Sequence, residues 1–91
     1  MDSAELKYIK DLLKNNDVEK ANQRLNNLTP ENTVDYWLLK GSIEQKLQNW
    51  GPALNAFSEV LEIDNNNTEA QNNIHIIQNI LNFWNPEMFN P

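Results

Sequence analysis

The sequence contains no cysteine, only two glycines and a single histidine in 91 residues. Without cysteine, the chain can form no disulfide and offers no thiolate for catalysis or metal binding. The two glycines, Gly41 and Gly51, stand apart, so no glycine-rich loop can cradle phosphates with its backbone amides. These absences remove the commonest routes to thiol chemistry and to nucleotide binding.

The remaining polar residues do not form a recognisable catalytic or metal-binding pattern. His75 has no acidic residue three or four positions away, and a metal site needs three or four convergent ligands. We interpret it as an incidental surface residue. Ser3, Ser42 and Ser58 have no base implied by their surroundings. We therefore expect a protein that is not an enzyme and that has no metal and no cofactor.

The charge of the chain is acidic and unevenly distributed. The net charge is −6 and the sequence pI is about 4.5, which disfavours nucleic acid as a partner because phosphate binding relies on clustered Lys and Arg. All seven basic residues lie between Lys7 and Lys46, and only acidic charges follow Leu47. We interpret these charges as solvated faces, with head-to-tail attraction between copies as the alternative.

Long apolar runs are also missing. No segment approaches the 18 apolar residues of a membrane span, and the start Met-Asp-Ser-Ala-Glu has no basic region followed by an apolar stretch. We therefore expect a cytoplasmic protein that does not bind membranes. With 40% hydrophobic residues, 91 residues are enough for one folded domain and too few for a second core.

The residues that are present point to helices. Thr33 can cap a helix running to Leu47, in which one buried stripe is predicted. Asn49 can cap a second helix with Pro52 in its first turn, where a missing N–H costs little. The polar run at residues 64–67 ends that helix. The stripes consist of Tyr36, Leu39, Ile43 and Leu47, and of Leu54, Phe57, Val60 and Leu61.

Gly41 lies inside the first of these helices, where glycine costs roughly 1 kcal/mol relative to alanine. A close helix crossing is the usual reason for such a glycine. If the second helix returns antiparallel to the first, it brings Ala53 back against Gly41. The sequence thus predicts that two small residues meet at the crossing.

A shortened earlier copy of this unit precedes it. Its helices are predicted at residues 4–15 and from Val18 onward, and Pro30 stops the second one. Downstream, Asn67 or Thr68 can cap a last helix with an apolar stripe and a polar face, as expected of a capping helix. Four apolar residues of the earlier copy each stand 32 residues before an apolar residue of the later unit. They are Val18, Ala21, Leu25 and Leu28, which correspond to Trp50, Ala53, Phe57 and Val60.

This pattern resembles the tetratricopeptide repeat, whose period is about 34 residues. Six single residues and one short run carry the resemblance, while Lys40, Glu44 and Asn65 depart from the family's leucine, tyrosine and proline. The aromatic tail from Phe83 to Pro91, with four large apolar side chains, resembles the terminal segment of small bacterial tetratricopeptide proteins. The matching residues are Trp37, Gly41, Leu47, Trp50, Ala53, Phe57 and the run 60–64.

The resemblance implies an all-α fold, an α-α superhelix of two helical hairpins with a C-terminal capping helix and an extended aromatic tail. It divides a single domain, 1–91, into a degenerate repeat at 3–30, a well-matched repeat at 33–65, a capping helix at 67–84 and a tail at 85–91. It also implies that Trp37 and Trp50 are core residues rather than ligand-stacking aromatics.

In this family the first helix of each repeat lines a concave groove that holds a peptide or protein segment. The resemblance therefore implies a non-catalytic protein–protein interaction module. The lysine and asparagine clamp that binds a terminal carboxylate in some members is not reproduced, because Leu6, Leu38 and Ser42 occupy its places. The groove residues that the resemblance assigns are Leu6, Lys10, Leu13, Lys14, Leu38, Ser42, Gln45, Lys46, Asn72, Ile76 and Asn79.

Two further readings stay open. Two repeats and a cap bury little area, so the chain is either a monomer or a weak homodimer that assembles through its hairpin ends or its aromatic tail. It is equally compatible with a regulatory subunit of an enzyme encoded elsewhere, which differs from the first reading only in the partner. Lys7, Lys10 and Lys14 are spaced to share one face of the first helix. We interpret this face as solvated, with attraction of an acidic segment as the alternative.

Overall fold

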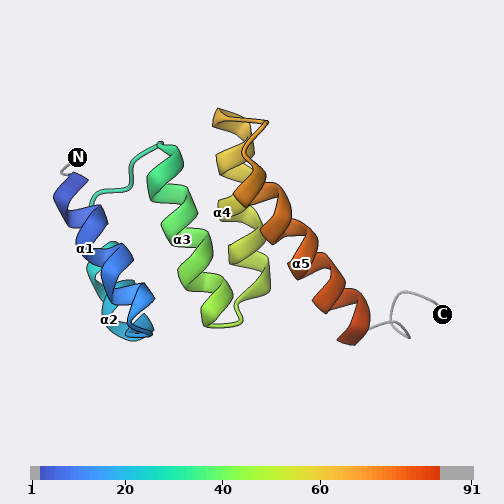
Figure 1. The fold of residues 1–91 in the computed structure, drawn as a ribbon, viewed down its shortest axis with the longest axis horizontal. Coiled ribbons are helices and arrows are strands. Elements are labelled where there is room, and N and C mark those ends of the chain that lie inside the picture. Colours follow the sequence, from blue (N-terminus) through green and yellow to red (C-terminus); the bar gives the residue numbers. More distant parts are fainter. Residues whose placement is uncertain (1–2, 85–91) are drawn as a thin grey trace.

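The structure, a computed structural model, describes residues 3–84, and this part of the chain contains helices and no strand (Figure 1). The expected all-α class is therefore confirmed. Residues 85–91, which include most of the predicted aromatic tail, lie outside the described part. The helices are α1 (Ser3–Lys14), α2 (Val18–Asn26), α3 (Val34–Lys46), α4 (Trp50–Ile63) and α5 (Thr68–Trp84).

Consecutive helices run antiparallel, so that α1, α3 and α5 point one way and α2 and α4 the other (Figure 1). The helix α3 packs most extensively on α4 and also contacts α1 and α2, whereas α5 packs on α4. The result is an elongated stack of 48 × 28 × 19 Å. Within residues 3–84, no helix has the length and apolar character needed to cross a membrane.

The turns that close α1 and α3 have the same geometry at positions 32 residues apart. Asn16 has φ 64° and Gln48 has φ 63°, both in the left-handed region. Asn16 N–H donates to Leu13 C=O at 3.0 Å, and Gln48 N–H donates to Gln45 C=O at 3.0 Å. The next amides, of Asp17 and Asn49, bond five residues back at 2.9 and 2.8 Å. Both turns are thus Schellman motifs, and the offset of 32 seen in the apolar residues extends to the backbone.

The capping predictions are confirmed at two helices and corrected at a third. The Thr33 hydroxyl accepts from Tyr36 N–H at 3.2 Å, and Asn67 Oδ1 accepts from Ala70 N–H at 2.9 Å. Asn49 occupies the predicted N-cap position of α4, but its side chain makes no capping hydrogen bond. It donates instead to Glu44 Oε1 at 3.4 Å, because the turn directs it back toward α3.

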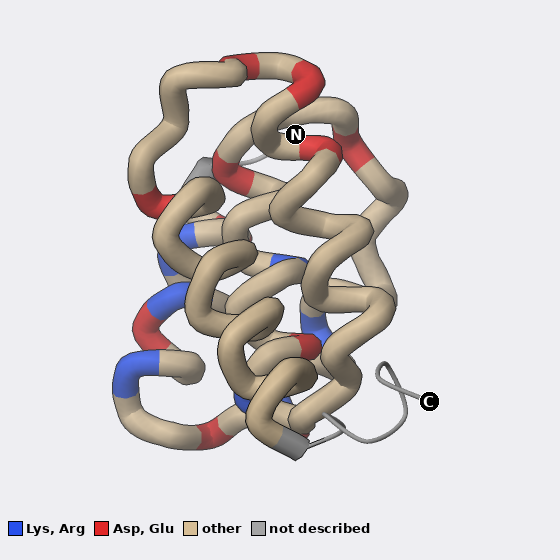
Figure 2. Tube along the Cα trace, turned by 90° about the vertical axis from the view of Figure 1, so that its right-hand side faces the viewer, with Lys and Arg blue, Asp and Glu red and all other residues tan. Residues whose placement is uncertain are grey.

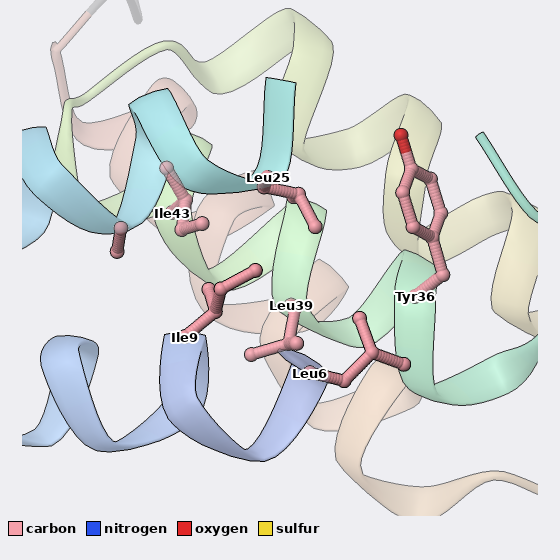
Figure 3. Close-up of a cluster of buried hydrophobic side chains, with 7 residues drawn as sticks. Leu6, Ile9, Leu25, Tyr36, Leu39 and Ile43 are labelled. Atoms are coloured by element: carbon pink, nitrogen blue, oxygen red, sulfur yellow. The ribbon is translucent and has the colours of Figure 1, made fainter. Parts of the chain in front are cut away.

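The apolar stripe of α3 is buried as predicted, but it does not face α4. Tyr36, Leu39 and Ile43 belong to a cluster with residues of α1 and α2, on which Leu47 also packs (Figure 3). The side of α3 that meets α4 carries Gly41. A helix that packs against partners on two faces needs apolar residues on both of them. The single predicted stripe therefore described only one of the two buried faces of α3. The other members of this first cluster are Leu6, Ile9, Ala21 and Leu25.

A second cluster fills the space between α4 and α5. Trp37 packs against this cluster as well as against the first one, and so joins the two halves of the core. Trp50 also packs against it and is partly buried, in agreement with the expected core role of both tryptophans. The buried residues of the second cluster are Ala53, Phe57, Val60, Ala70 and Ile77.

The close approach of α3 and α4 is made by the Phe57 ring lying on Gly41. A Cβ built on Gly41 would come within 2.7, 2.8 and 2.9 Å of three atoms of that ring. The three atoms nearest to that Cβ thus belong to a large ring, which the sequence analysis did not expect beside Gly41. The position 32 residues before Gly41 is Ile9 and that before Phe57 is Leu25, so the first hairpin fills the same place with two medium side chains.

We predict that Gly41→Ala lowers the free energy of unfolding by about 1 kcal/mol. Displacing the fully buried Phe57 ring costs about 1–3 kcal/mol, which exceeds the roughly 1 kcal/mol that alanine gains in helix propensity. Gly41→Leu should cost more. Urea denaturation followed by circular dichroism measures each value.

Gly51→Ala is the matched control, since a Cβ at Gly51 meets nothing within 4 Å and the residue is exposed in the first turn of α4. It should stabilise the protein by a few tenths to about 1 kcal/mol. In a Phe57→Leu background the penalty of Gly41→Ala should shrink. Equal stabilisation by the two alanines would contradict the ring contact.

We further predict that Gln48→Gly stabilises the protein by up to about 1 kcal/mol. A left-handed conformation costs a non-glycine residue about 1–2 kcal/mol, which outweighs the 0.5–1 kcal/mol that glycine adds to the entropic cost of folding. Gln78→Gly, at an exposed interior position of α5, should instead destabilise by about 1 kcal/mol. Loss of stability in both variants would show that the Gln48 turn is not strained.

Candidate functional site

A groove of about 790 Å³ opens along the side of the stack where α1, α3 and α5 lie next to each other. It is lined by six residues of α1, six of α3 and two of α5. From α1 these are Leu6, Lys7, Lys10, Asp11, Leu13 and Lys14; from α3, Asp35, Leu38, Leu39, Ser42, Gln45 and Lys46; and from α5, Glu69 and Asn73.

The groove has an apolar floor and a charged rim. Leu6 and Leu39 are buried members of the first core cluster, so the floor is continuous with the core (Figure 3). Leu13 and Leu38 are partly exposed and present apolar surface to the groove. An apolar base bordered by a few polar groups is the usual composition of a binding site.

The rim carries four lysines and three carboxylates, all exposed. Among the described residues, none of these seven side chains has an ion-pair or hydrogen-bond partner. Arg24, outside the groove, is by contrast paired, with its Nε 3.7 Å from Glu5 Oε1 and its guanidinium carbon 4.8 Å from the centre of the Tyr8 ring. The charges of the groove are therefore open to an external partner.

All eight groove residues predicted on the first and third helices line this one groove. The three predicted on the last helix, Asn72, Ile76 and Asn79, are exposed but do not line it. Glu69 and Asn73 take their place. The helix α5 leans away from α3 along its length, and its first two turns lie at the groove (Figure 1).

The sequence reasoning missed six lining residues. Lys7, Asp11 and Leu39 lie three or four residues from predicted groove residues of α1 and α3. Residues at this spacing share one side of a helix, so a wider predicted face would have included them. Asp35 stands two residues after the predicted cap Thr33, in the first turn of the helix, where an acidic residue is favoured. No signal identified Glu69 and Asn73, because the rotation of a capping helix depends on its packing against α4 rather than on a repeat pattern.

Nothing in residues 3–84 gathers three or more His, Cys, Asp or Glu side chains into a group that could hold a metal ion. His75 is exposed on α5 and is not among the groove residues. Burial raises the pKa of the Tyr36 phenol, so this side chain stays neutral to a higher pH than an exposed tyrosine does. Trp37 is held within the fold: its Nε1 donates to Asn32 Oδ1 at 3.1 Å, and its ring meets Tyr36 edge-on with centroids 5.1 Å apart.

Comparison with protein-family models, with curated proteins and with solved structures finds no match to this chain. The groove and the helical stack are therefore the observations on which a function can be based.

Proposed function

We propose that this chain is a non-catalytic protein-interaction module that binds a peptide or protein segment in the groove between α1, α3 and α5. The observation that carries the proposal is the groove itself, with apolar side chains at its base and seven unpaired charges at its rim. A protein segment supplies both apolar side chains and charges, so it matches this surface better than a small apolar ligand does.

We also propose that the stack is a short superhelix of the tetratricopeptide type. The two Schellman turns, 32 residues apart with matching hydrogen bonds, support an internal repeat. The matched core positions Leu25 and Phe57 support it too. In this reading α1 and α3 are the first helices of successive repeats, and α5 is the cap. The shared direction of α1, α3 and α5 (Figure 1) supports this assignment, because residues of all three helices line the groove.

The test fills the groove with a side chain. We predict that Ser42→Trp abolishes peptide binding, because Ser42 is partly buried at the groove and the indole would occupy the ligand's place. Peptides enriched from a random heptapeptide display library on the unmodified protein are titrated calorimetrically against each variant. Circular dichroism and thermal melting show whether each variant is folded.

Ser58→Trp is the matched control, since Ser58 is exposed on α4 and does not line the groove. It should bind the enriched peptides as the unmodified protein does. Equal binding by both tryptophan variants, with both folded, would contradict the assignment of the groove as the binding site. Failure of the library to yield any specific peptide would contradict the proposed function.

The second candidate function is self-assembly, favoured by apolar side chains on one exposed face of α5. Ile76 is 49% exposed and Phe83 is 78% exposed, and seven residues of separation place them on the same side of the helix. Exposed apolar residues that lie together are typical of contacts between copies. The surface is distinct from the groove, so the two functions are compatible.

We predict on this basis that Ile76→Asn shifts a concentration-dependent monomer–dimer equilibrium toward monomer. Sedimentation velocity at several concentrations measures the equilibrium. Ile63→Asn is the matched control, because Ile63 is 42% exposed at the end of α4 and does not share that face. If the unmodified protein sediments as a monomer at every concentration, the self-assembly function is wrong.

A further inference from the structure

We infer that the groove selects a segment with opposite charges at its two ends, acidic at one corner of the groove and basic at the diagonally opposite corner. This inference rests on the proposed function and specifies the partner's chemistry. It goes beyond the general ability of a helical groove to hold a peptide, because it follows from where this chain places its unpaired charges.

The basic corner lies where α1 and α3 end. Lys14 and Lys46 stand in the last turns of these two helices, 32 residues apart, and both line the groove. Lys10 lies one turn above Lys14 on the same side of α1. Asp11 lowers the local charge but leaves an excess of positive charge. An acidic group bound here would meet several ammonium groups without displacing an existing ion pair.

The acidic corner lies where α3 and α5 begin. Asp35 and Glu69 stand in the first turns of these helices and both line the groove. Figure 2 shows acidic residues gathered at this end of the molecule, at the top, with the basic residues lower down. Lys7 lines the groove from α1, across from Asp35 and Glu69. The charge of the rim therefore changes from positive on α1 to negative at the start of α5. A lysine or arginine of the partner would complement this corner.

The separation of the corners sets the length of the segment. Along α3, Asp35 of the acidic corner and Lys46 of the basic corner lie eleven residues apart, or about 16 Å at the rise of an α-helix, and the diagonal from α1 to α5 is longer. An extended peptide covers that length with about five residues, and a helical one with about eleven. Leu13 and Leu38 lie between the charged corners and present partly exposed apolar surface. The expected extended ligand therefore has an acidic end, an apolar middle and a basic end within a heptapeptide.

The experiment selects a random heptapeptide library on the unmodified protein and on three variants. Lys14→Gln with Lys46→Gln neutralises the basic corner, and Asp35→Asn with Glu69→Gln neutralises the acidic corner. Lys20→Gln is the control, because Lys20 is exposed on α2 and does not line the groove. All five positions are exposed, so the fold should be preserved, which circular dichroism verifies.

Peptides enriched on the unmodified protein should carry Asp or Glu at one end and Lys or Arg about five residues away. The first variant should lose the preference for acidic residues and the second the preference for basic ones, each neutralised charge weakening binding roughly two- to fivefold. Raising the salt concentration should weaken binding to the unmodified protein more than to either variant. The control should match the unmodified protein.

The failures of the two proposals are distinguishable. Peptides that are lost on Ser42→Trp but show no charge pattern would overturn the charge-polar groove and leave the binding function standing. A charge pattern that Lys20→Gln changes as much as the groove variants would overturn it as well. No enrichment of any peptide would overturn both the binding function and the charge selection.

Discussion

The contact of the Phe57 ring with Gly41 sets the distance between α3 and α4, and the arrangement of the other helices depends on it. Because the ring takes the space of a missing Cβ, α3 approaches α4 on one face and keeps Tyr36, Leu39 and Ile43 for α1 and α2. Any side chain at Gly41 would push the two helices apart. The ring is fully buried and has little room to move, so the contact acts as a fixed spacer.

Local signals were sufficient to predict the helices, and the resemblance to the tetratricopeptide repeat implied most of the groove. Thr33 and Asn67 cap as expected because their short side chains reach an amide three residues on, a relation contained in the sequence itself. The groove residues of α1 and α3 were implied by that resemblance, in which the first helix of each repeat lines the groove. The three positions predicted on α5 do not line this groove, because the rotation of α5 is set by Ala70 and Ile77 packing on α4, and no local pattern encodes that contact. Gly41 similarly predicted a close approach of two helices, but the sequence did not identify the Phe57 ring as the group in contact with it.

The two hairpins conserve their backbone turns more closely than their core side chains. The Schellman turns at Asn16 and Gln48 have nearly the same φ, although neither residue is glycine. In the core, Ile9 corresponds to Gly41 and Leu25 to Phe57. The side-chain volume that is missing at Gly41 is made up by the larger ring of Phe57. Core packing responds to the summed volume of neighbouring side chains, whereas a turn must meet a fixed backbone geometry. The 32-residue correspondence between the two hairpins is thus clearer in the backbone than in the core side chains.

The helix α3 contributes to both the core and the groove, and this shared use determines what each part of the proposed site can supply. Leu39 is anchored in the first cluster, so the base of the groove is shaped before a partner arrives and costs little ordering on binding. Lys14 and Lys46 are long, exposed side chains whose ion pairs in water are individually weak. Affinity should therefore come mainly from the leucines, whereas the charged corners determine which segments bind, in which direction, and how quickly they associate.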